Sequence, residues 1–500
     1  MSGAPPRALQ MGQAPGTHWY HAHKHGSTAI DVANGMTGAF VIEGGYDDGI
    51  NSYYGKDWTK QAKVLVINQI GVTPNLERAG SGGNGATDKG PNFAVNGRLD
   101  PVMTMYPGEV QMWRIVNTSG RASALFPTPP GGLQWRQLAQ DGVQFNAANY
   151  GAPPFTNNSF LLAPGNRADF LVKAPMTSGK IDVTAQNEVD PTDLFAFPTP
   201  VNVPLFTVNV TGQGTAMNFM PSAPAFPLFL ADIQDGEVTG KKTVTFASTG
   251  PPFAQHTIDN TKFNGEVGEV VLLNTVEEWK VVNETFGPNI SHPFHIHINP
   301  FQLTEIFSPN DTLTINKGAG TVAVAANSAT VTGTSTHFTT DVRPGWVINI
   351  AGLGAQTIQS VQTDTSLTLT ATAGPATAAT YTVNVPRYVF VNSPAPLAGQ
   401  CYVDPSDPST WKPCAAVPQP PKTNNIWWDT FPIPSGIAVT WAPNSSATTP
   451  VNIPGYFKMR SRFVDYSGYY VIHCHILAHE DRGMMTVVEV APLTSPYSHD

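Results

Sequence analysis

The stretch that decides the fold is EVQMWRIVN at residues 109–117, because the chain repeats its pattern as TVEEWKVVN at residues 275–283. Each copy follows an Asn-Gly pair and runs through Trp, a basic residue and two β-branched residues to Asn. Residues two apart share one face of a strand, so the alternation about Trp113 and Trp279 predicts two sheet strands. A repeat with this matched spacing predicts duplicated β-domains and not a solenoid.

The composition agrees with a chain built from strands. The 500 residues suffice for two to four domains. Charged residues make up only 13%, whereas Gly and Pro number 45 each, as expected of short strands joined by turns. Helical periodicity is weak throughout, so we expect an all-β chain of sandwich or barrel domains. Further strand patterns, separated by turn signals, lie at 63–69, 167–173, 269–274, 301–307, 388–391, 469–475 and 485–490.

Charge and hydropathy exclude several classes of function. The net charge of −9 argues against nucleic acid as the main partner. The absence of any apolar run of about 18 residues predicts that no helix spans a membrane. Residues 1–6 have neither the basic nor the apolar part of a signal peptide.

Cys401 and Cys414 close a Pro-rich loop; a disulfide there would imply an oxidising compartment, and two free thiols are the alternative.

Residues 312–385 differ in composition from the rest of the chain. They are rich in Thr, Ala, Val, Ser and Gly, carry few charges, and separate FQLTEIFSP (301–309) from PRYVFV (386–391). Periodic β-branched residues predict four or five short strands in this segment. We therefore expect a small inserted β-domain; a disordered low-complexity loop is the alternative.

Ten of the 13 histidines lie in three clusters, HWYHAHKH (18–25), HPFHIH (292–297) and HCHILAH (473–479). A lone histidine is usually structural, but no packing rule favours three His-x-His clusters. On a strand, residues i and i+2 point to the same face, so paired imidazoles can reach one metal or two neighbouring metals. Imidazole suits zinc, copper, iron and nickel, and the spacing alone does not choose between them.

Cys474 indicates copper. Its side chain is expected to point away from the two flanking histidines, so it serves a different metal from theirs while the backbone joins the two sites. His479 and Met484 can return to the Cys474 side, and His292 is the natural second histidine. Two His, one Cys and a weak axial Met form the ligand set of blue-copper electron-transfer sites. Zinc, the main rival, more often uses paired cysteines or a carboxylate.

These motifs resemble the multicopper oxidases, a family that includes laccases, ascorbate oxidase and bacterial cuprous oxidases. GTHWYHAHKHGST (16–28), HPFHIHINPFQ (292–302) and HCHILAHEDRGMM (473–485) look like its second, third and fourth copper motifs, and PGEVQMWRIVN (107–117) and PGNRADFLV (164–172) look like its middle domain. The resemblance covers nearly the whole chain outside the insertion. It implies tandem cupredoxin-like Greek-key β-sandwich or barrel domains: a C-terminal remnant of domain 1 at 1–50, domain 2 at 51–220, and domain 3 at 221–311 and 386–500, with the small β-domain inserted at 312–385.

The same resemblance implies a copper ligand set, carried over residue by residue. It places type 1 copper on His292, Cys474 and His479, with Met484 axial. It places His295 at type 2 copper, and at the two type 3 coppers it places His23, His297 and His473 on one and His21 and His475 on the other. Glu480 matches a position where related bacterial enzymes carry an acid suggested to relay protons. His25 has no ligand role in the family pattern, and His18 is expected to be structural.

The implied activity is one-electron oxidation of phenols, aromatic amines or a reduced metal ion at type 1 copper, coupled through the His-Cys-His bridge to reduction of O2 to water. The methionines are scattered, without the dense Met-rich segment of cuprous oxidases, which favours organic reductants.

The resemblance also implies a periplasmic or secreted location. One alternative is a non-enzymatic blue-copper protein that shuttles electrons or stores copper; another is a carbohydrate- or surface-binding role for the inserted domain.

The chain departs from the family pattern near its start. The family's first His-x-His motif normally lies well before the second, which here begins at residue 17 with no histidine before it. Six of the eight family cluster ligands remain, so the type 2 site and one type 3 site would each lack one. We expect a truncated chain, ligands borrowed from a neighbouring chain, or loss of efficient O2 reduction. The exposed edge of an incomplete β-domain also favours a homo-oligomer.

Overall fold

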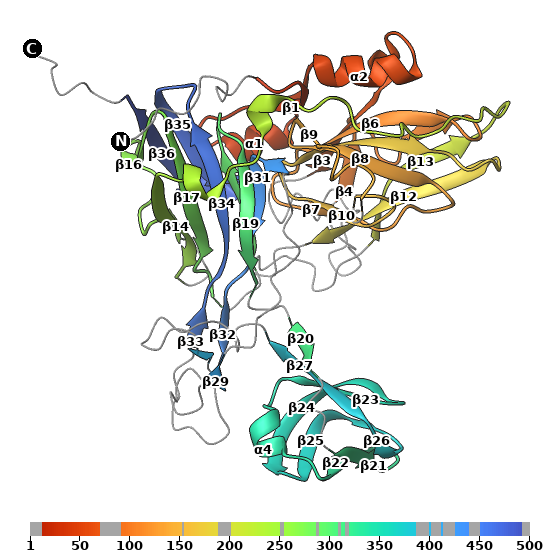
Figure 1. The fold of residues 1–500 in the computed structure, drawn as a ribbon, viewed down its shortest axis with the longest axis vertical. Coiled ribbons are helices and arrows are strands. Elements are labelled where there is room, and N and C mark those ends of the chain that lie inside the picture. The colour runs from red at the N-terminus through yellow and green to blue at the C-terminus, as the bar shows by residue number, and fades with distance from the viewer. Residues whose placement is uncertain are drawn as a thin grey trace, which may run out of the picture. The chain divides into compact units, whose positions relative to one another are not determined.

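The computed structural model describes residues 13–70, 92–152, 155–188, 202–250, 255–286, 290–308, 312–315, 320–386, 400–401, 412–413, 426–439 and 451–492. The chain divides into two compact units: the first comprises Met1–Ile306, Pro420–Pro434 and Tyr456–Asp500, and the second comprises Phe307–Gln419 and Ser435–Gly455. Strands dominate both units (Figure 1), which confirms the expected all-β class. Within the described ranges, every helix is too short or too polar to cross a bilayer.

The first unit contains two β-sandwiches, and the earlier one in sequence packs a six-stranded sheet against a five-stranded sheet (Figure 1). Trp113 and Phe206 meet in the core between the sheets, with ring centroids 5.3 Å apart. The six-stranded sheet has the order β4-β3-β6-β11-β8-β9, with β3 Lys63–Ile70, β4 Asn92–Val95, β6 Val110–Asn117, β8 Gln134–Gln140, β9 Val143–Gln144 and β11 Arg167–Lys173. The five-stranded sheet has the order β10-β7-β12-β13-β5, with β5 Val102–Met105, β7 Ser123–Phe126, β10 Phe160–Leu162, β12 Gly179–Glu188 and β13 Asn202–Val210.

The second sandwich of the first unit has the same two-layer plan. Its core contains Trp279 and Phe463 together with the side chains of Cys474 and Met484. One sheet has the order β15-β14-β17-β34-β19-β30, with β14 Gly240–Thr249, β15 Gln255–Ile258, β17 Thr275–Asn283, β19 Phe301–Phe307, β30 Trp427–Trp428 and β34 Gly455–Phe463. The other has the order β16-β36-β35-β18-β31, with β16 Val267–Leu272, β18 His292–Ile296, β31 Thr430–Ile433, β35 Gly468–Cys474 and β36 Met485–Ala491.

The repeated stretches form β6 and β17, which hold equivalent places in the two sandwiches. Each pairs in parallel with the first long strand of its own sandwich, β6 with β3 and β17 with β14. Trp113 and Trp279 are buried in the two cores. Removing a ring system of this size from water contributes about 4–6 kcal/mol to stability. The repeat therefore supplies the central aromatic residue of each sandwich.

The asparagine that ends each repeat fixes the turn that follows it. Nδ2 of Asn117 donates to the carbonyl of Ala122, and its Oδ1 accepts the N–H of Ser119. Asn283 makes the same two bonds, donating to the carbonyl of Ile290 and accepting the N–H of Thr285. The two sandwiches therefore share both the repeated strand and the turn that follows it, in agreement with the predicted duplication.

Residues 13–61 add a two-stranded ribbon and short helices to the first unit. β1 (Gly16–His21) pairs antiparallel with β2 (Thr37–Ile42), and α1 (Thr28–Ala33) lies between them in sequence. The helix α2 (Gly45–Tyr54) follows and contains the predicted boundary between residues 50 and 51. No helix was predicted for these residues. Asp47 accepts the N–H of Gly44 and so satisfies one donor at the start of α2, whose inner side chains are buried.

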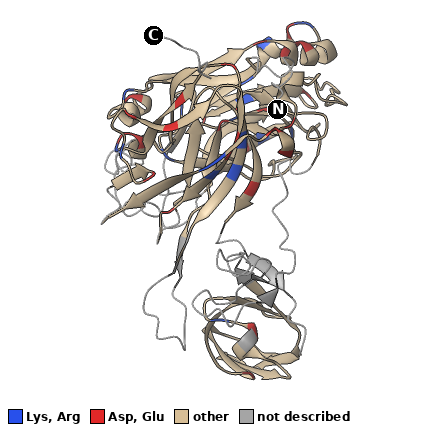
Figure 2. Ribbon diagram, turned by 60° about the vertical axis from the view of Figure 1, so that its left-hand side comes forward, with Lys and Arg blue, Asp and Glu red and all other residues tan. Residues whose placement is uncertain are grey.

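The second unit is built around one eight-stranded sheet with the order β20-β27-β23-β24-β25-β22-β21-β26. Its core includes Trp346 and Tyr381, and residues 320–386 carry only three charged side chains (Figure 2). This segment therefore folds as a sheet and is not a disordered loop, with eight strands where four or five were predicted. The strands are β20 Thr312–Ile315, β21 Thr321–Val324, β22 Ser328–Thr334, β23 Val347–Ile350, β24 Gly354–Thr363, β25 Ser366–Ala373, β26 Ala376–Ala379 and β27 Tyr381–Pro386.

Two further strand pairs belong to the second unit: β28 (Gln400–Cys401) with β29 (Lys412–Pro413), and β32 (Ile437–Val439) with β33 (Val451–Ile453). The strand predicted at 388–391 lies outside the described residues, as does Cys414. The disulfide between Cys401 and Cys414 and the four domain boundaries stay predictions.

Candidate metal centre

Two adjacent strands carry three of the clustered histidines, His292, His295 and His473, together with Cys474. β18 pairs antiparallel with β35, which places His295 opposite His473 and Phe294 opposite Cys474. Successive side chains of a strand point to opposite faces of the sheet, and opposed residues share one face. The pairing therefore gathers imidazoles on one face and the thiol on the other.

The thiol belongs to a first set of donors, here called the cysteine group, which comprises His292, Cys474 and His479. Nδ1 of His292 and Nδ1 of His479 lie 3.6 and 3.8 Å from Sγ of Cys474, and 3.3 Å from each other. His292 and Cys474 are 0% exposed and His479 is 8% exposed. Met484 is buried in the same core, and backbone hydrogen bonds join it to both His479 and Cys474.

Neighbouring side chains hold both imidazoles of the cysteine group in place. Oγ1 of Thr285 lies 2.9 Å from Nε2 of His292, and the ring of His256 stacks on that of His479 with centroids 4.1 Å apart. Burial is the main cause that lowers the pKa of His292 to about 3 and holds the pKa of His479 well below its usual value. Both rings are therefore neutral, so the nitrogens beside Cys474 have lone pairs to offer a metal.

A second set of donors, here called the histidine group, comprises His21, His23, His295, His297, His473 and His475. At its centre, Nε2 of His473 lies 3.2 Å from Nε2 of His23 and 3.3 Å from Nε2 of His297. Burial, and then the nearby imidazole of His473, lowers the pKa of both His23 and His297. Three imidazole nitrogens therefore converge on one point.

His475 is the most poorly satisfied member of the histidine group. It is fully buried, yet neither of its ring nitrogens has a hydrogen-bond partner among the described residues. The rings of His21 and His295 each lie 5.4 Å from its ring, centroid to centroid. A buried polar atom without a partner costs free energy, which a bound metal ion would offset.

Glu480 faces the histidine group although it directly follows a member of the cysteine group. Adjacent residues of a helix such as α5 (Leu477–Glu480) point about 100° apart. One carboxylate oxygen of Glu480 lies 3.1 Å from Nδ1 of His473, and the other lies 3.5 Å from Nδ1 of His23. Burial raises the pKa of this carboxyl, but the imidazoles of His473 and then His23 outweigh it and lower the pKa to about 2.

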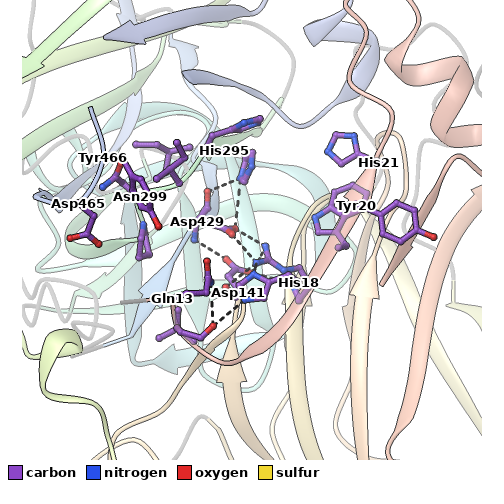
Figure 3. Close-up of a pocket in the computed structure, with 18 of the residues that line it drawn as sticks. Gln13, His18, Tyr20, His21, Asp141, His295, Asn299, Asp429, Asp465 and Tyr466 are labelled. Atoms are coloured by element: carbon purple, nitrogen blue, oxygen red, sulfur yellow. Dashed lines mark hydrogen bonds and ion pairs between the residues drawn. The ribbon is translucent and has the colours of Figure 1, made fainter. Parts of the chain in front are cut away.

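A cavity of about 460 Å³ opens onto the histidine group (Figure 3). His21, His23, His295 and His297 form part of its wall, and Tyr466 lines it as well. A space of this size admits small molecules to the imidazoles. The charged side chains Asp141, Arg167, Asp429 and Asp465 also line it, so the cavity is polar as well as imidazole-rich.

An Arg–Asp network beside His295 was not predicted. Arg167 of β11 donates to both carboxylate oxygens of Asp429, at 2.7 and 2.8 Å, and to the carbonyl of Asp141. The carbonyl of Asp429 and Oγ1 of Thr430 each lie 2.9 Å from Nδ1 of His295. The first sandwich thereby helps to orient a donor of the second. Arg167 and Asp429 were visible in the sequence, but no spacing rule pairs residues so far apart.

An acid that follows the last histidine cluster binds the backbone that follows the first one. The carboxylate of Asp481 accepts the N–H groups of Gly26, Thr28 and Ala29, at 2.8, 3.0 and 2.8 Å. His25 itself is exposed, with its ring against Phe263. His18 lines the cavity near Arg167 and does not lie among the rings of the histidine group.

The distances within both groups fit a bound metal ion. Two imidazole nitrogens about 2.0–2.1 Å from one tetrahedral metal lie roughly 3.3 Å apart, and a thiolate about 2.3 Å from the metal lies roughly 3.6 Å from such a nitrogen. The nitrogen pairs measured here are 3.2 and 3.3 Å apart, and the sulfur–nitrogen pairs are 3.6 and 3.8 Å apart. A thiolate with two imidazoles and a buried Met is a soft donor set that suits copper.

Comparison of the sequence with known families gives a match to the multicopper oxidases over residues 237–347 and 408–494. The multicopper oxidase LPR2 of Arabidopsis thaliana is 23% identical over 59% of this chain and 50% of its own length. A laccase of Bacillus subtilis (strain 168) is 22% identical over 57% of this chain and 55% of its own length. The chain spans about half the length of the curated relatives it matches.

Solved structures share the fold. A multicopper oxidase from Campylobacter jejuni, described as a metallo-oxidase, aligns with a TM-score of 0.53 at 16% identity, covering 97% of this chain and 73% of its own. The McoA multicopper oxidase of the hyperthermophile Aquifex aeolicus aligns with a TM-score of 0.55 at 17% identity, covering 95% and 76%. These neighbours support tandem cupredoxin-like domains as the architecture.

Proposed function

The chain is a relative of the laccase-like multicopper oxidases, and from this premise we propose that it is a copper-dependent oxidase that removes single electrons from phenols or aromatic amines. Four such oxidations balance the reduction of one O2, with four protons, to two water molecules. When bound, copper supplies one-electron redox chemistry at the cysteine group and oxygen reduction at the histidine group. The protein supplies the donors, the path between them and the protons.

One observation carries the proposal: the two donor groups are joined by consecutive residues. Sγ of Cys474 belongs to the cysteine group, whereas the rings of His473 and His475 belong to the histidine group. An electron received at the thiolate therefore has a continuous covalent path, through a single peptide unit on either side, to the imidazoles where O2 would be reduced. Separate structural metal sites would need no such bridge.

Each residue of the two groups has a proposed role. His292, Cys474 and His479, with Met484, would hold type 1 copper, and His295 would hold type 2 copper. His23, His297 and His473 would hold one type 3 copper, and His21 and His475 would contribute to the other. Glu480, ionised and 3.1 Å from Nδ1 of His473, would pass protons toward the cavity. Thr285 orients the ring of His292 through its Nε2.

Spectroscopy and oxygen uptake of the copper-loaded full chain test the proposal. We expect an absorption band near about 600 nm from type 1 copper, a near-ultraviolet shoulder from the type 3 pair, and O2 uptake with a phenolic reductant. Cys474→Ser should remove the visible band, whereas His337→Ala, a histidine of the second unit, should keep it. Absence of the band from the copper-loaded chain would overturn the proposal. A band without O2 uptake would favour an electron-transfer or copper-binding protein instead.

Location and assembly belong to the same proposal. The family resemblance supports a periplasmic or secreted protein, and fractionation of cells that make it tests this.

We also propose a homo-oligomer. The ribbon of β1 and β2 is short, and its side chains Tyr20 and Phe40 are 61 and 56% exposed, so a second chain could cover them. Sedimentation of the purified chain measures the oligomeric state, and a monomer at all concentrations would contradict it.

A further inference from the structure

The cysteine group is reached from solvent at His479. His292 and Cys474 are 0% exposed, whereas 8% of His479 is exposed. One face of its ring is covered by His256, and its Nδ1 faces Cys474 and His292. A reductant that gives its electron to the cysteine group therefore does so at the exposed edge of His479, whose surroundings decide which reductants come close. This inference rests on the proposed function.

Two other chain segments contact the chain on either side of His479. Arg482 lies in the loop that follows His479, and its N–H donates to the carbonyl of His479. The segment of Lys262 packs against the loop: the N–H of Phe263 donates to the carbonyl of Gly483, and a Cβ on Gly483 would lie 3.0 Å from Cβ of Lys262. On another side, the N–H of Leu477 donates to the carbonyl of Gly120, which precedes Arg121.

These segments bring three positive charges to the surroundings of His479. Arg482 and Lys262 are exposed and Arg121 is half-buried. The pKa of His479 is held well below its usual value first by burial, then by His256 and His292, and then by Arg482 and Arg121. Burial, and then Arg482 and Lys262, lower the pKa of His256. Cationic groups therefore act on both rings at this edge.

The acids of the same loop point elsewhere. Glu480 is fully buried against His473 and His23 in the histidine group. Asp481 is bound by the backbone N–H groups at the start of α1. Near Lys262, Glu266 is exposed, and its side chain accepts from Nδ2 of Asn264. The loop thus directs its negative charge inward and its positive charge outward.

We propose that Arg482 and Lys262, with Arg121 beside them, form a cationic approach to His479 that selects anionic reductants, such as phenolates and carboxylate-bearing phenols, over cationic ones, such as reduced metal ions. The step would transfer one electron: the anion would lose it and become a radical, or the next higher oxidation state of a metal complex, and the electron would go to the copper that the cysteine group would hold. No atom moves between donor and protein. The residues act by raising the local concentration of the anion.

Two one-electron reductants of opposite charge test the proposal directly. The copper-loaded full chain is mixed without O2 with hexacyanoferrate(II) or with hexaammineruthenium(II), and bleaching of the visible band gives the rate of electron transfer. At an ionic strength of about 0.01 M, removing one cation about 10 Å from the site should slow the anion roughly threefold to tenfold and speed the cation by a smaller factor. At about 1 M salt, where the screening length is about 3 Å, these differences should vanish.

Matched variants assign the effect to the named residues. Arg482→Gln and Lys262→Gln should each change the ratio of the two rates as described, and Arg482→Glu should change it further. Arg482→Lys should keep the wild-type ratio within about twofold because it keeps the charge. Lys180→Gln, which removes an exposed lysine on β12 of the other sandwich, should leave the ratio unchanged.

A binding measurement on the copper-free chain gives a readout that needs no redox activity. Hexacyanocobaltate(III) is an anion that the protein cannot reduce, and its cobalt-NMR line should broaden with the wild-type chain and less with Arg482→Gln. Equal salt dependence for both reductants, or wild-type rate ratios and line widths in both Gln variants, would overturn the cationic approach. If the copper-loaded chain shows no visible band, the proposed function fails instead, and the cobalt measurement still decides whether anions gather at these residues.

Discussion

Replacing Arg167 with Met should destabilise the first unit and disturb the histidine group while leaving the cysteine group intact. Arg167 is 2% exposed and its guanidinium makes charge-assisted hydrogen bonds to both oxygens of Asp429, with a further bond to the carbonyl of Asp141. Methionine keeps much of the volume but leaves the Asp429 carboxylate, whose side chain is 20% exposed, without its cation. Removing one partner of a buried ion pair costs about 3–5 kcal/mol.

The assay is thermal unfolding of the copper-free chain, followed by calorimetry. A loss of about 3–5 kcal/mol in a domain of this size lowers Tm by roughly 6–20 °C. Lys180→Met, on an exposed face of β12, is the control and should leave Tm within about 2 °C. In the double variant Arg167→Met/Asp429→Asn the unpaired charge is gone, so part of the loss should return.

The same variant makes a prediction about copper. Asp429 and Thr430 orient His295 through its Nδ1, so the histidine group should lose copper while the visible band of the cysteine group persists. Metal analysis and the absorption spectrum of the loaded variant measure the two effects separately. A Tm within about 3 °C of wild type, or equal loss of copper from both groups, would refute the view that Arg167 braces His295 across the two sandwiches.

Other predictions test single residues. Cys474→Ser should abolish the visible band and lower the bound copper by about one ion per chain, measured by metal analysis; a retained band would contradict its ligand role. Thr285→Val removes the contact with Nε2 of His292 and should weaken copper binding at the cysteine group about 10-fold to 100-fold, measured by competition with a chelator; unchanged affinity would show that Thr285 does not orient the ring. Burial and then the neighbouring Glu269 raise the pKa of Asp259 to about 6, so the folded state binds more protons than the unfolded state between about pH 4 and 6, and stability should fall as pH rises through this window. Asp259→Asn should flatten that fall in a series of Tm measurements; an unchanged slope would assign it to another group.

The strands were predictable because their signals are local. Alternation about Trp113 and Trp279 is set by the geometry of a single strand, and it placed β6 and β17 correctly. The same alternation separated Cys474 from its flanking histidines before any partner strand was known. The pairing of β18 with β35 places His295 opposite His473. The spacing of residues within one segment does not predict which strand lies beside it.

The residues that support the candidate site were not predictable because their partners are distant in sequence. Arg167 and Asp429 are 262 positions apart, and only folding brings them together. His256 is a lone histidine, the kind that is usually structural, yet its ring stacks on His479. The helix α2 was missed because its apolar residues are few and its start is stabilised by one local bond from Gly44 to Asp47. The copper assignments themselves stay predictions until the metal is measured.

The matching turns after Asn117 and Asn283 bear on how a metal site is gained or lost in evolution. In the second sandwich the carbonyl bound by Asn283 belongs to Ile290, and two residues later stands His292. In the first sandwich the carbonyl bound by Asn117 belongs to Ala122, and two residues later stands Ala124, buried in an apolar core. The same frame thus carries a candidate ligand in one copy and a methyl group in the other. Substitutions at such a position can add or erase a cofactor while the architecture persists, so descent from a common fold fixes the scaffold and leaves the chemistry free to diverge.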